Sequence, residues 1–259
     1  MGEYQFKKEI CMRLDKFLSN GGVGSRKEVK QILKKGVVQV NGDVIKNPQF
    51  QVNETKDYVT VYGENVTYTP FVYIMMNKPK GIISATEDRR ERTVIDLLEP
   101  WMQAYHPFPV GRLDKNTEGL LLITNDGQLA HRLLSPKKHV DKKYWVKIDQ
   151  VMTSKMQEEV EKGIQLDDGY ITKPGALEIL DYECGEGYIT IQEGKFHQIK
   201  RMFQALDAKV IGLKRLEMGT LKLDDSLVLG AFRLLTEDEV QNLYGEHTIE
   251  ISRNIRRQP

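Results

Sequence analysis

The sequence predicts an α+β protein, in which a small N-terminal unit precedes a larger unit with a mixed, largely antiparallel sheet and flanking helices. Two helical segments and a hairpin pattern occupy residues 12–63. A polar, turn-prone linker follows at 64–70. Residues 71–244 then mix strand and helix patterns without the regular alternation that produces a parallel sheet. Residues 245–259 form a basic tail.

The first unit begins with two short helices. Residues 13–20 carry apolar side chains at helical spacing, and Gly21 starts the glycine pair that ends this segment. Ser25 and Glu28 form a capping box that begins a second helix, which Gly36 ends. A unit of this size has little core of its own.

A hairpin and one more strand complete the first unit. Strand-like residues at 37–40 and 44–45 flank Asn41-Gly42, which is a strong signal for a two-residue turn. Residues 58–62 alternate as a further strand.

The second unit is expected to have a buried central strand. Residues 119–124 are a continuous apolar run, and Asn125-Asp126-Gly127 turns the chain from that strand into a helix. The remaining expected elements are strands at 71–76, 144–148 and 188–191, helices at 93–98 and 196–206, a helix capped by Ser154 with Gln157, and a last helix capped by Thr236 with Glu239.

The composition is that of an ordinary soluble globular protein. Of the 259 residues, 40% are hydrophobic and 29% charged, and no apolar run approaches the roughly 20 residues of a membrane span. The polar N-terminus is unlike a secretory signal. The two cysteines, Cys11 and Cys184, exclude a disulfide framework and a cysteine-rich metal site and fit a reducing compartment. We expect a cytoplasmic, monomeric protein with no metal and no membrane partner.

Basic residues are concentrated in blocks, although the net charge is only +1. Eight Lys/Arg stand against three Asp/Glu at 13–46, five against one at 137–147, and six against two at 193–215. At 157–186 nine acids stand against two bases. Such basic blocks are expected of a surface that contacts phosphates, although a charge run is often only a solvated face.

A polar loop at 111–119 leads into the buried strand and is the first candidate site. Asp114 lies between Arg112 and Lys115. A carboxylate near cations stays ionised and can act as a nucleophile or a base, and a rigid strand beside the loop would hold it in place. Taken alone, an aspartate in a turn more often accepts hydrogen bonds from loop amides.

Residues 193–203 form a second candidate site. On a helix the polar and cationic side chains of this stretch would share one face: His197, Lys200, Arg201 and Gln204. The apolar side chains would be buried on another face: Phe196, Ile199, Phe203 and Leu206. The pattern suits contact with a phosphate or a carboxylate, and equally a solvated amphipathic helix.

An aromatic pair among lysines is the third candidate. Strand alternation puts Tyr144 and Val146 on one face, and Lys143, Trp145 and Lys147 on the other. An aromatic side chain among cations can stack on an unpaired base, although most such side chains belong to the core.

Three stretches resemble, in order, the signature sequences of the RsuA family of pseudouridine synthases: residues 77–81, 111–127 and 193–203. The segment that runs from Met12 through Asn41-Gly42 resembles the S4 (αL-type) RNA-binding domain that precedes the catalytic domain in that family. The resemblance extends to about Tyr244. It departs at Glu118, where the family more often has a small residue. The long middle stretch outweighs the reading of Asp114 as a turn residue.

The resemblance implies that uridine in ribosomal RNA is converted to pseudouridine, without a cofactor or a metal. It implies that Asp114 is the essential aspartate, that Tyr144 packs on the target base, and that Lys200 pairs with the aspartate. Attack on the base, attack on the sugar and abstraction of a sugar proton stay open as roles for the carboxylate. Arg112 would fill the gap left by the flipped nucleotide, because such enzymes must extrude their target base.

The resemblance also names further contacts with RNA. Ile211 or Leu213 would form an apolar floor to the site. Other residues expected to bind substrate are Asn77, Lys78, Lys195, His197, Gln198 and Arg201. Those expected to bind RNA in the S4 unit are Arg13, Lys16, Ser25, Arg26, Lys27, Lys30, Lys34, Lys35 and Asn41. The charge at 13–46 predicts that the S4 unit supplies affinity and the catalytic unit supplies selectivity.

Alternative functions differ in target or in chemistry. The segment Phe196 to Lys200 favours the small-subunit 16S type, and the same reaction on 23S RNA is the alternative. A non-catalytic RNA-binding or ribosome-assembly protein is a second alternative, against which the full motif around Asp114 speaks. An S4-containing methyltransferase would need a glycine-rich cofactor loop, which is missing from the sequence. The expected partner is ribosomal RNA or a ribosomal assembly particle.

Overall fold

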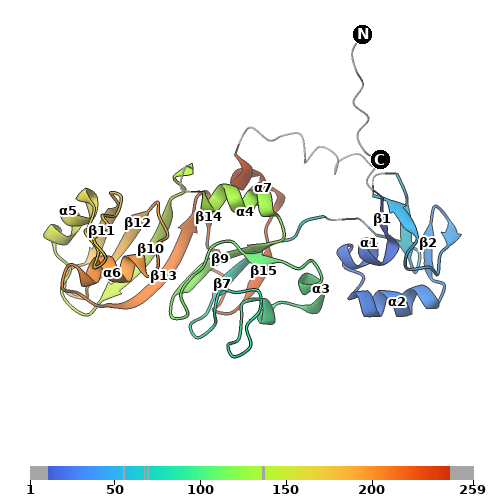
Figure 1. Cartoon of the computed structure of the whole chain (residues 1–259), viewed down its shortest axis with the longest axis horizontal. Coiled ribbons are helices and arrows are strands. Elements are labelled where there is room, and N and C mark those ends of the chain that lie inside the picture. The colour runs from blue at the N-terminus through green and yellow to red at the C-terminus, as the bar shows by residue number, and fades with distance from the viewer. Residues whose placement is uncertain (1–10, 55, 67, 69, 136–137, 246–259) are drawn as a thin grey trace, which may run out of the picture. The chain divides into compact units, whose positions relative to one another are not determined.

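The structure is a computed structural model that describes residues 11–54, 56–66, 68, 70–135 and 138–245 (Figure 1). Contacts divide the chain into two compact units. The first comprises the described residues up to Val72 together with Leu98–Pro107, and the second comprises Tyr73–Leu97 and the described residues from Phe108 onward. The predicted basic tail lies, apart from Gly245, outside the described residues. Within those residues no helix is long and apolar enough to cross a membrane.

The first unit packs helices against two small antiparallel sheets. Its core is formed mainly by Phe17, Leu18, Val29 and Leu33 of the two long helices and by valines of the strands. The helices are α1 (Leu14–Asn20), α2 (Arg26–Lys34) and α3 (Pro100–Gln103). Strands β1 (Cys11–Arg13) and β4 (Gln51–Asn53) form one sheet, and β3 (Asp43–Val44), β2 (Val38–Val40), β5 (Val59–Val61) and β6 (Glu64–Asn65) form the other in that order.

Local signals in the first unit are confirmed. The Ser25 hydroxyl accepts from the backbone N–H of Glu28 while the Glu28 carboxylate accepts from the backbone N–H of Ser25, so the capping box begins α2 as predicted. Asn41 and Gly42 have φ values of 53° and 92° and join β2 to β3. Two successive positive φ angles are those of the type I′ turn that an Asn-Gly pair favours.

The second unit is built on a nine-stranded, mostly antiparallel sheet, as predicted (Figure 1). Along its main path the strands are β11 (Ala176–Asp181), β12 (Glu186–Ile191), β10 (Lys142–Ile148), β13 (Val210–Met218), β9 (Glu118–Thr124), β7 (Tyr73–Lys78) and β15 (Phe232–Leu234), and β8 (Phe108–Pro109) and β14 (Leu221–Lys222) pair beside β9 and β13. Among the pairings between the described strands of this sheet, β9 with β13 alone is parallel.

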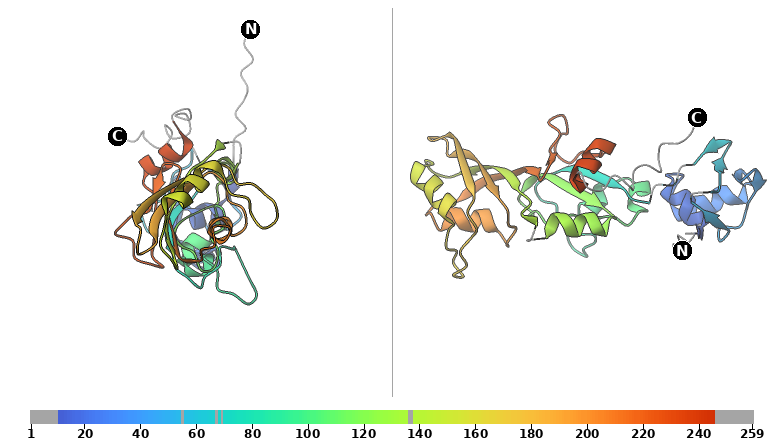
Figure 2. Two further views of the ribbon diagram at one scale, coloured as in Figure 1. Left: turned by 90° about the vertical axis from the view of Figure 1, so that its left-hand side faces the viewer. Right: turned by 90° about the horizontal axis from the view of Figure 1, so that it is seen from above.

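Helices cover the two ends of this sheet separately, as Figures 1 and 2 show. Helices α4 (Gly127–Leu134) and α7 (Glu237–Tyr244) bury Leu129, Leu133 and Leu243 against Leu120 and Leu122 of β9. Helix α5 (Ser154–Lys162) packs on β11, and α6 (Gln198–Gln204) packs on β13. A 3-10 turn, η1 (Ile95–Leu97), stands where a short helix was predicted.

The patterns of the second unit are largely confirmed. Strand β9 is buried from Gly119 to Thr124, and β10 alternates between buried and half-buried residues with Tyr144 on the buried side. Thr236 and Glu239 form the predicted capping box of α7. The predicted cap of α5 is wrong by one residue, because the hydroxyl of Thr153 accepts from the Met156 N–H where Ser154 was expected to do so.

The predicted helix at 196–206 is wrong at its start. Helix α6 begins at Gln198, because His197 has a left-handed φ of 50° that no helix can include. Phe196 therefore lies outside the helix and is exposed, contrary to the expectation that it is buried. Ile199 and Phe203 are buried as predicted.

Candidate active site

Asp114 lies in the loop that connects β8 to β9, at the centre of the sheet. The loop is held at its first half by Ser84, whose hydroxyl donates to the Leu113 carbonyl at 2.9 Å and accepts from the Leu113 N–H at 3.1 Å. It ends at Gly119, where β9 meets β13. A Cβ on Gly119 would lie 2.2 Å from the Arg215 carbonyl oxygen, so only glycine fits this crossing.

Lys78 fixes the second half of the same loop through hydrogen bonds to its backbone carbonyls. Its side chain is completely buried at the end of β7. The ammonium donates to the carbonyls of Pro79, Asp114, Lys115 and Thr117 at 3.0–3.3 Å. Burial lowers the pKa of this amine to about 8. Lys78 was expected to bind substrate, but it fixes the loop backbone in the structure.

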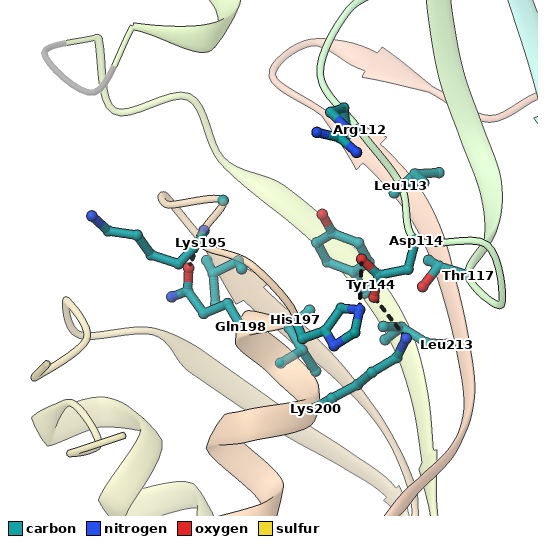
Figure 3. Close-up of a pocket in the computed structure, with 13 residues that line it drawn as sticks. Arg112, Leu113, Asp114, Thr117, Tyr144, Lys195, His197, Gln198, Lys200 and Leu213 are labelled. Carbon is teal, nitrogen blue, oxygen red and sulfur yellow. Dashed lines mark hydrogen bonds and ion pairs between the residues drawn. The ribbon is translucent and has the colours of Figure 1, made fainter. Parts of the chain in front are cut away.

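The carboxylate of Asp114 is paired with Lys200 from the first turn of α6. The Lys200 Nζ lies 2.6 Å from Oδ2, and the His197 Nε2 lies 3.6 Å from Oδ1 (Figure 3). The side chains of Asp114 and Lys200 are 24% and 29% exposed, so the pair is accessible from the pocket without being fully solvated. The left-handed turn at His197 turns this imidazole toward Asp114 (Figure 3).

These groups line a small, open pocket with a volume of about 60 Å³. Tyr144 and Leu213 come from the neighbouring strands β10 and β13 and contribute a ring and an aliphatic wall beside Asp114 (Figure 3). Both side chains are more than nine-tenths buried. The pocket therefore combines one ion pair with an aromatic face. It is lined by Arg112, Leu113, Asp114, Thr117, Tyr144, Ile191, Gly194, Lys195, His197, Gln198, Ile199, Lys200 and Leu213.

Several predicted residues meet at this pocket in different ways. Arg112 and Lys195 are exposed at it. Gln198 is buried, and its amide accepts from the Lys195 N–H at 3.0 Å and donates to Glu193 at 3.0 Å. Gln198 thus fixes the segment that carries His197 and Lys195.

Besides Lys78, three predicted residues do not line the pocket. Arg201 forms ion pairs with Asp167 and Asp168 on the other side of α6, so the shared face expected with Lys200 is wrong. Asn77 is buried and donates to the Leu227 carbonyl at 2.6 Å. Ile211 is 51% exposed, which leaves Leu213 as the apolar residue at the pocket.

The residues predicted to bind RNA in the first unit are mostly exposed. Three have internal partners. The amide of Asn41 bonds to Asp57 and to the Tyr58 N–H, Arg13 pairs with Asp15 at 2.7 Å, and Ser25 caps α2 through Glu28. The others extend into solvent from α1, α2 and the residue after α2: Lys16, Arg26, Lys27, Lys30, Lys34 and Lys35.

Sequence reasoning missed Thr117, Glu193 and Ser84. Thr117 lines the pocket, and its buried hydroxyl has no hydrogen-bond partner among the residues that the structure describes. Glu193 accepts from Tyr170, the Lys173 N–H and Gln198. Burial opposes ionisation of Glu193, but these hydrogen bonds outweigh it and lower its pKa. Thr117 and Glu193 lie inside the two candidate stretches, 111–119 and 193–203, without having been given a role. No local pattern marks Ser84, whose partner Leu113 is 29 positions away. Among the described residues no three His, Cys, Asp or Glu side chains gather as a metal site.

Two family models match the chain. The model described as RNA pseudouridylate synthase matches residues 72–205, and the S4 domain model matches residues 12–57. The first match includes the loop of Asp114, the strand of Tyr144 and the helix of Lys200.

Similar proteins cover almost the whole chain. A protein of Bacillus subtilis strain 168 named "Uncharacterized RNA pseudouridine synthase YtzG" is 51% identical over 234 residues, which are 90% of this chain and 98% of that protein. "Ribosomal small subunit pseudouridine synthase A" of Vibrio cholerae is 43% identical over 90% of this chain and all of its own length. A solved structure titled "Crystal structure of pseudouridylate synthase" matches with a TM-score of 0.63 and 35% identity, over 90% of this chain and 99% of that one.

Proposed function

We propose, from the premise that this chain belongs to the RNA pseudouridylate synthase family and carries an S4 domain, that it isomerises one uridine of small-subunit 16S ribosomal RNA. In this reaction the bond between C1′ of the ribose and N1 of the base breaks. The uracil turns over and a bond forms between C1′ and C5. C5 loses its proton and N1 takes up a proton. Substrate and product have the same atoms, so no co-reactant is needed.

The ion pair of Asp114 and Lys200 at the pocket is the observation that carries the proposal. A carboxylate at this position can supply the oxygen that attacks the base or the sugar, or the base that takes a sugar proton. The Lys200 ammonium, 2.6 Å away, balances its charge while the glycosidic bond is broken.

The pocket walls suit an extruded pyrimidine. Flipping a nucleotide out of a helix costs a few kcal/mol, and stacking a base on an aromatic ring returns about 1–3 kcal/mol. Tyr144 provides that ring and Leu213 an apolar floor, both beside Asp114. Arg112, exposed at the same pocket, is suited to occupy the gap that the uridine leaves in the RNA.

The 16S target is supported by the Vibrio cholerae relative, whose name assigns it to the small subunit. The segment from Phe196 to Lys200 supports the same choice. The exposed cations of α2 support an S4 unit that binds RNA through its phosphates.

Mapping pseudouridines tests the proposal. The 16S and 23S RNAs would be mapped in cells with and without this protein, and again after the deletion is complemented by wild type or by Asp114→Asn. We expect one 16S pseudouridine to disappear, to return with wild type, and to stay absent with the variant. Release of tritium from RNA labelled at uridine C5 would measure the same reaction on purified components.

Each other result has a definite meaning. A pseudouridine lost from 23S RNA would overturn the 16S assignment and leave the reaction standing. Unchanged maps of both RNAs would overturn ribosomal RNA as the target. A site restored by Asp114→Asn would remove the carboxylate from the chemistry.

A further inference from the structure

Phe196 has the most exposed large apolar side chain in the described part of the chain, at 76%. Single exposed apolar residues are common on protein surfaces, so the position and contacts of this ring decide its meaning. Its chain neighbours Lys195 and His197 both line the pocket of Asp114. The exposed ring therefore belongs to the rim of the candidate active site.

The Phe196 ring stacks on the imidazole of His197. Their centroids are 3.8 Å apart and their planes differ by 19°. The His197 Nε2 lies 3.6 Å from the Asp114 carboxylate. The two rings thus form a stack whose inner member contacts the carboxylate and whose outer member faces solvent.

The backbone holds this stack in place. His197 has a left-handed φ of 50°, which is uncommon for a residue other than glycine and recurs at functional sites. The segment from Glu193 to His197 is fixed by the side chain of Gln198, which hydrogen-bonds to the Lys195 N–H and to the Glu193 carboxylate. An exposed aromatic ring on a fixed backbone loses little freedom when a partner stacks on it.

Charges at the pocket indicate what the partner is. Arg112 and Lys195 are exposed cations at the same pocket. Proteins that bind unpaired nucleic acid combine a cationic track for the backbone with aromatic rings on which bases stack. The surroundings of Phe196 therefore favour a nucleobase over an apolar protein surface.

We propose that the outer face of Phe196 stacks on the base next to the target uridine. When the uridine leaves the helix, its neighbour loses a stacking partner. Phe196 replaces that partner for the base on one side of the gap, Arg112 occupies the gap toward the other side, and Tyr144 receives the uridine itself. The inference rests on the proposed function and adds to it a subsite for the adjacent nucleotide.

A double-mutant cycle between protein and RNA tests the stacking. The protein would be wild type, Phe196→Leu, Phe196→Trp or the control Tyr182→Leu, which replaces a half-exposed aromatic that does not line the pocket, in the turn between β11 and β12. The RNA would be a fragment with the mapped uridine, either intact or with an abasic nucleotide on its 5′ or 3′ side. KM and the single-turnover rate would be measured for each pair.

We expect Phe196→Leu to raise KM for intact RNA by about 5- to 150-fold, which is the 1–3 kcal/mol of one stacked base at 1.4 kcal/mol per tenfold. The loss should appear in KM more than in the single-turnover rate. It should vanish with one of the two abasic fragments, Phe196→Trp should retain tight binding, and Tyr182→Leu should behave as wild type.

An unchanged KM for Phe196→Leu would overturn the stacking. An equal loss on the intact and both abasic fragments would also overturn it, and would assign the ring to packing or to contact with a protein. The fragment is taken from whichever RNA the mapping identifies, so an error in the 16S assignment changes the fragment and not the result. Conversion of the intact fragment by wild type reports separately on the proposed function.

Discussion

The ammonium of Lys78 donates to the backbone carbonyl of Asp114 at 3.1 Å, directly beneath the residue whose carboxylate faces the pocket. The same ammonium contacts the carbonyls of Lys115 and Thr117. The loop is thus fixed from a strand that does not itself line the pocket. Two different lysines therefore serve Asp114: Lys78 positions its backbone, and Lys200 balances the charge of its carboxylate.

The buried amine makes stability depend on pH in a definite direction. The pKa of Lys78 is lowered by burial to about 8, whereas an unfolded lysine titrates near 10.5. Between these values the unfolded chain binds more protons, so the contribution of Lys78 to the free energy of unfolding rises with pH, by about 1.4 kcal/mol per pH unit. Below about pH 8 the contribution is constant.

Urea unfolding of wild type and Lys78→Met at pH 7, 8, 9 and 10 measures how the contribution of Lys78 to the free energy of unfolding depends on pH. A Trp101→Phe background leaves Trp145, in the catalytic unit, as the single tryptophan reporter. We expect the difference in the free energy of unfolding, wild type minus Lys78→Met, to be constant up to about pH 8 and to increase at higher pH. A difference that stays flat to pH 10 would mean that the four carbonyls keep the ammonium charged.

Replacing Lys200 tests the charge partner of Asp114. Lys200→Met should keep the fold and lower kcat by about 10²–10³-fold, the usual cost of removing one electrostatic donor from an active site. Lys200→Arg should recover part of the loss, because the charge is kept with a different shape. Lys162→Met on the surface of α5 is the matched control. Tritium release measures all three, and a fully active Lys200→Met would contradict the role.

Gly119 is expected to be irreplaceable for packing reasons. Its φ is +100°, and a Cβ would clash with the Arg215 backbone. Gly119→Ala should lower the free energy of unfolding by about 2 kcal/mol or more. Gly127→Ala, at the first position of α4 with open space around the added carbon, should be neutral or slightly stabilising. Equal stability of the two variants in thermal unfolding would contradict the predicted clash.

Salt dependence tests the first unit. Lys30 and Lys34 are exposed one turn apart on α2. If both contact phosphates, Lys30→Gln with Lys34→Gln should lower the slope of log affinity against log salt by about 0.7–0.9 per lysine. Lys155→Gln on α5 is the control and should leave the slope unchanged. A slope that the double variant does not alter would place these lysines away from RNA.

Local signals predicted the parts of the fold that depend on neighbours in sequence. Three such features are confirmed, and each depends on only a few adjacent residues: the capping box at Ser25, the turn at Asn41-Gly42 and the apolar run of β9. The pairing of Asp114 with Lys200 spans 86 positions. Resemblance to a family, and not spacing, brought these two residues together in the prediction.

The errors have a common physical cause. Helical periodicity placed Phe196 and Arg201 by their spacing. The left-handed residue His197 delays the start of the helix to Gln198, and Asp167 and Asp168 from a distant loop pair with Arg201. Lys78 was expected to bind substrate, because nothing near it in sequence shows that four carbonyls surround its ammonium. Tertiary contacts decided all three positions.

The parallel pairing of β9 with β13 joins the two parts of the sheet that build the pocket. It is two residue pairs long, Lys214 with Glu118 and Arg215 with Gly119. Asp114 belongs to the part of the sheet on one side of this seam, and Tyr144 and Lys200 belong to the other. The ion pair of Asp114 with Lys200 therefore bridges the seam and adds a side-chain link beside the two backbone pairs.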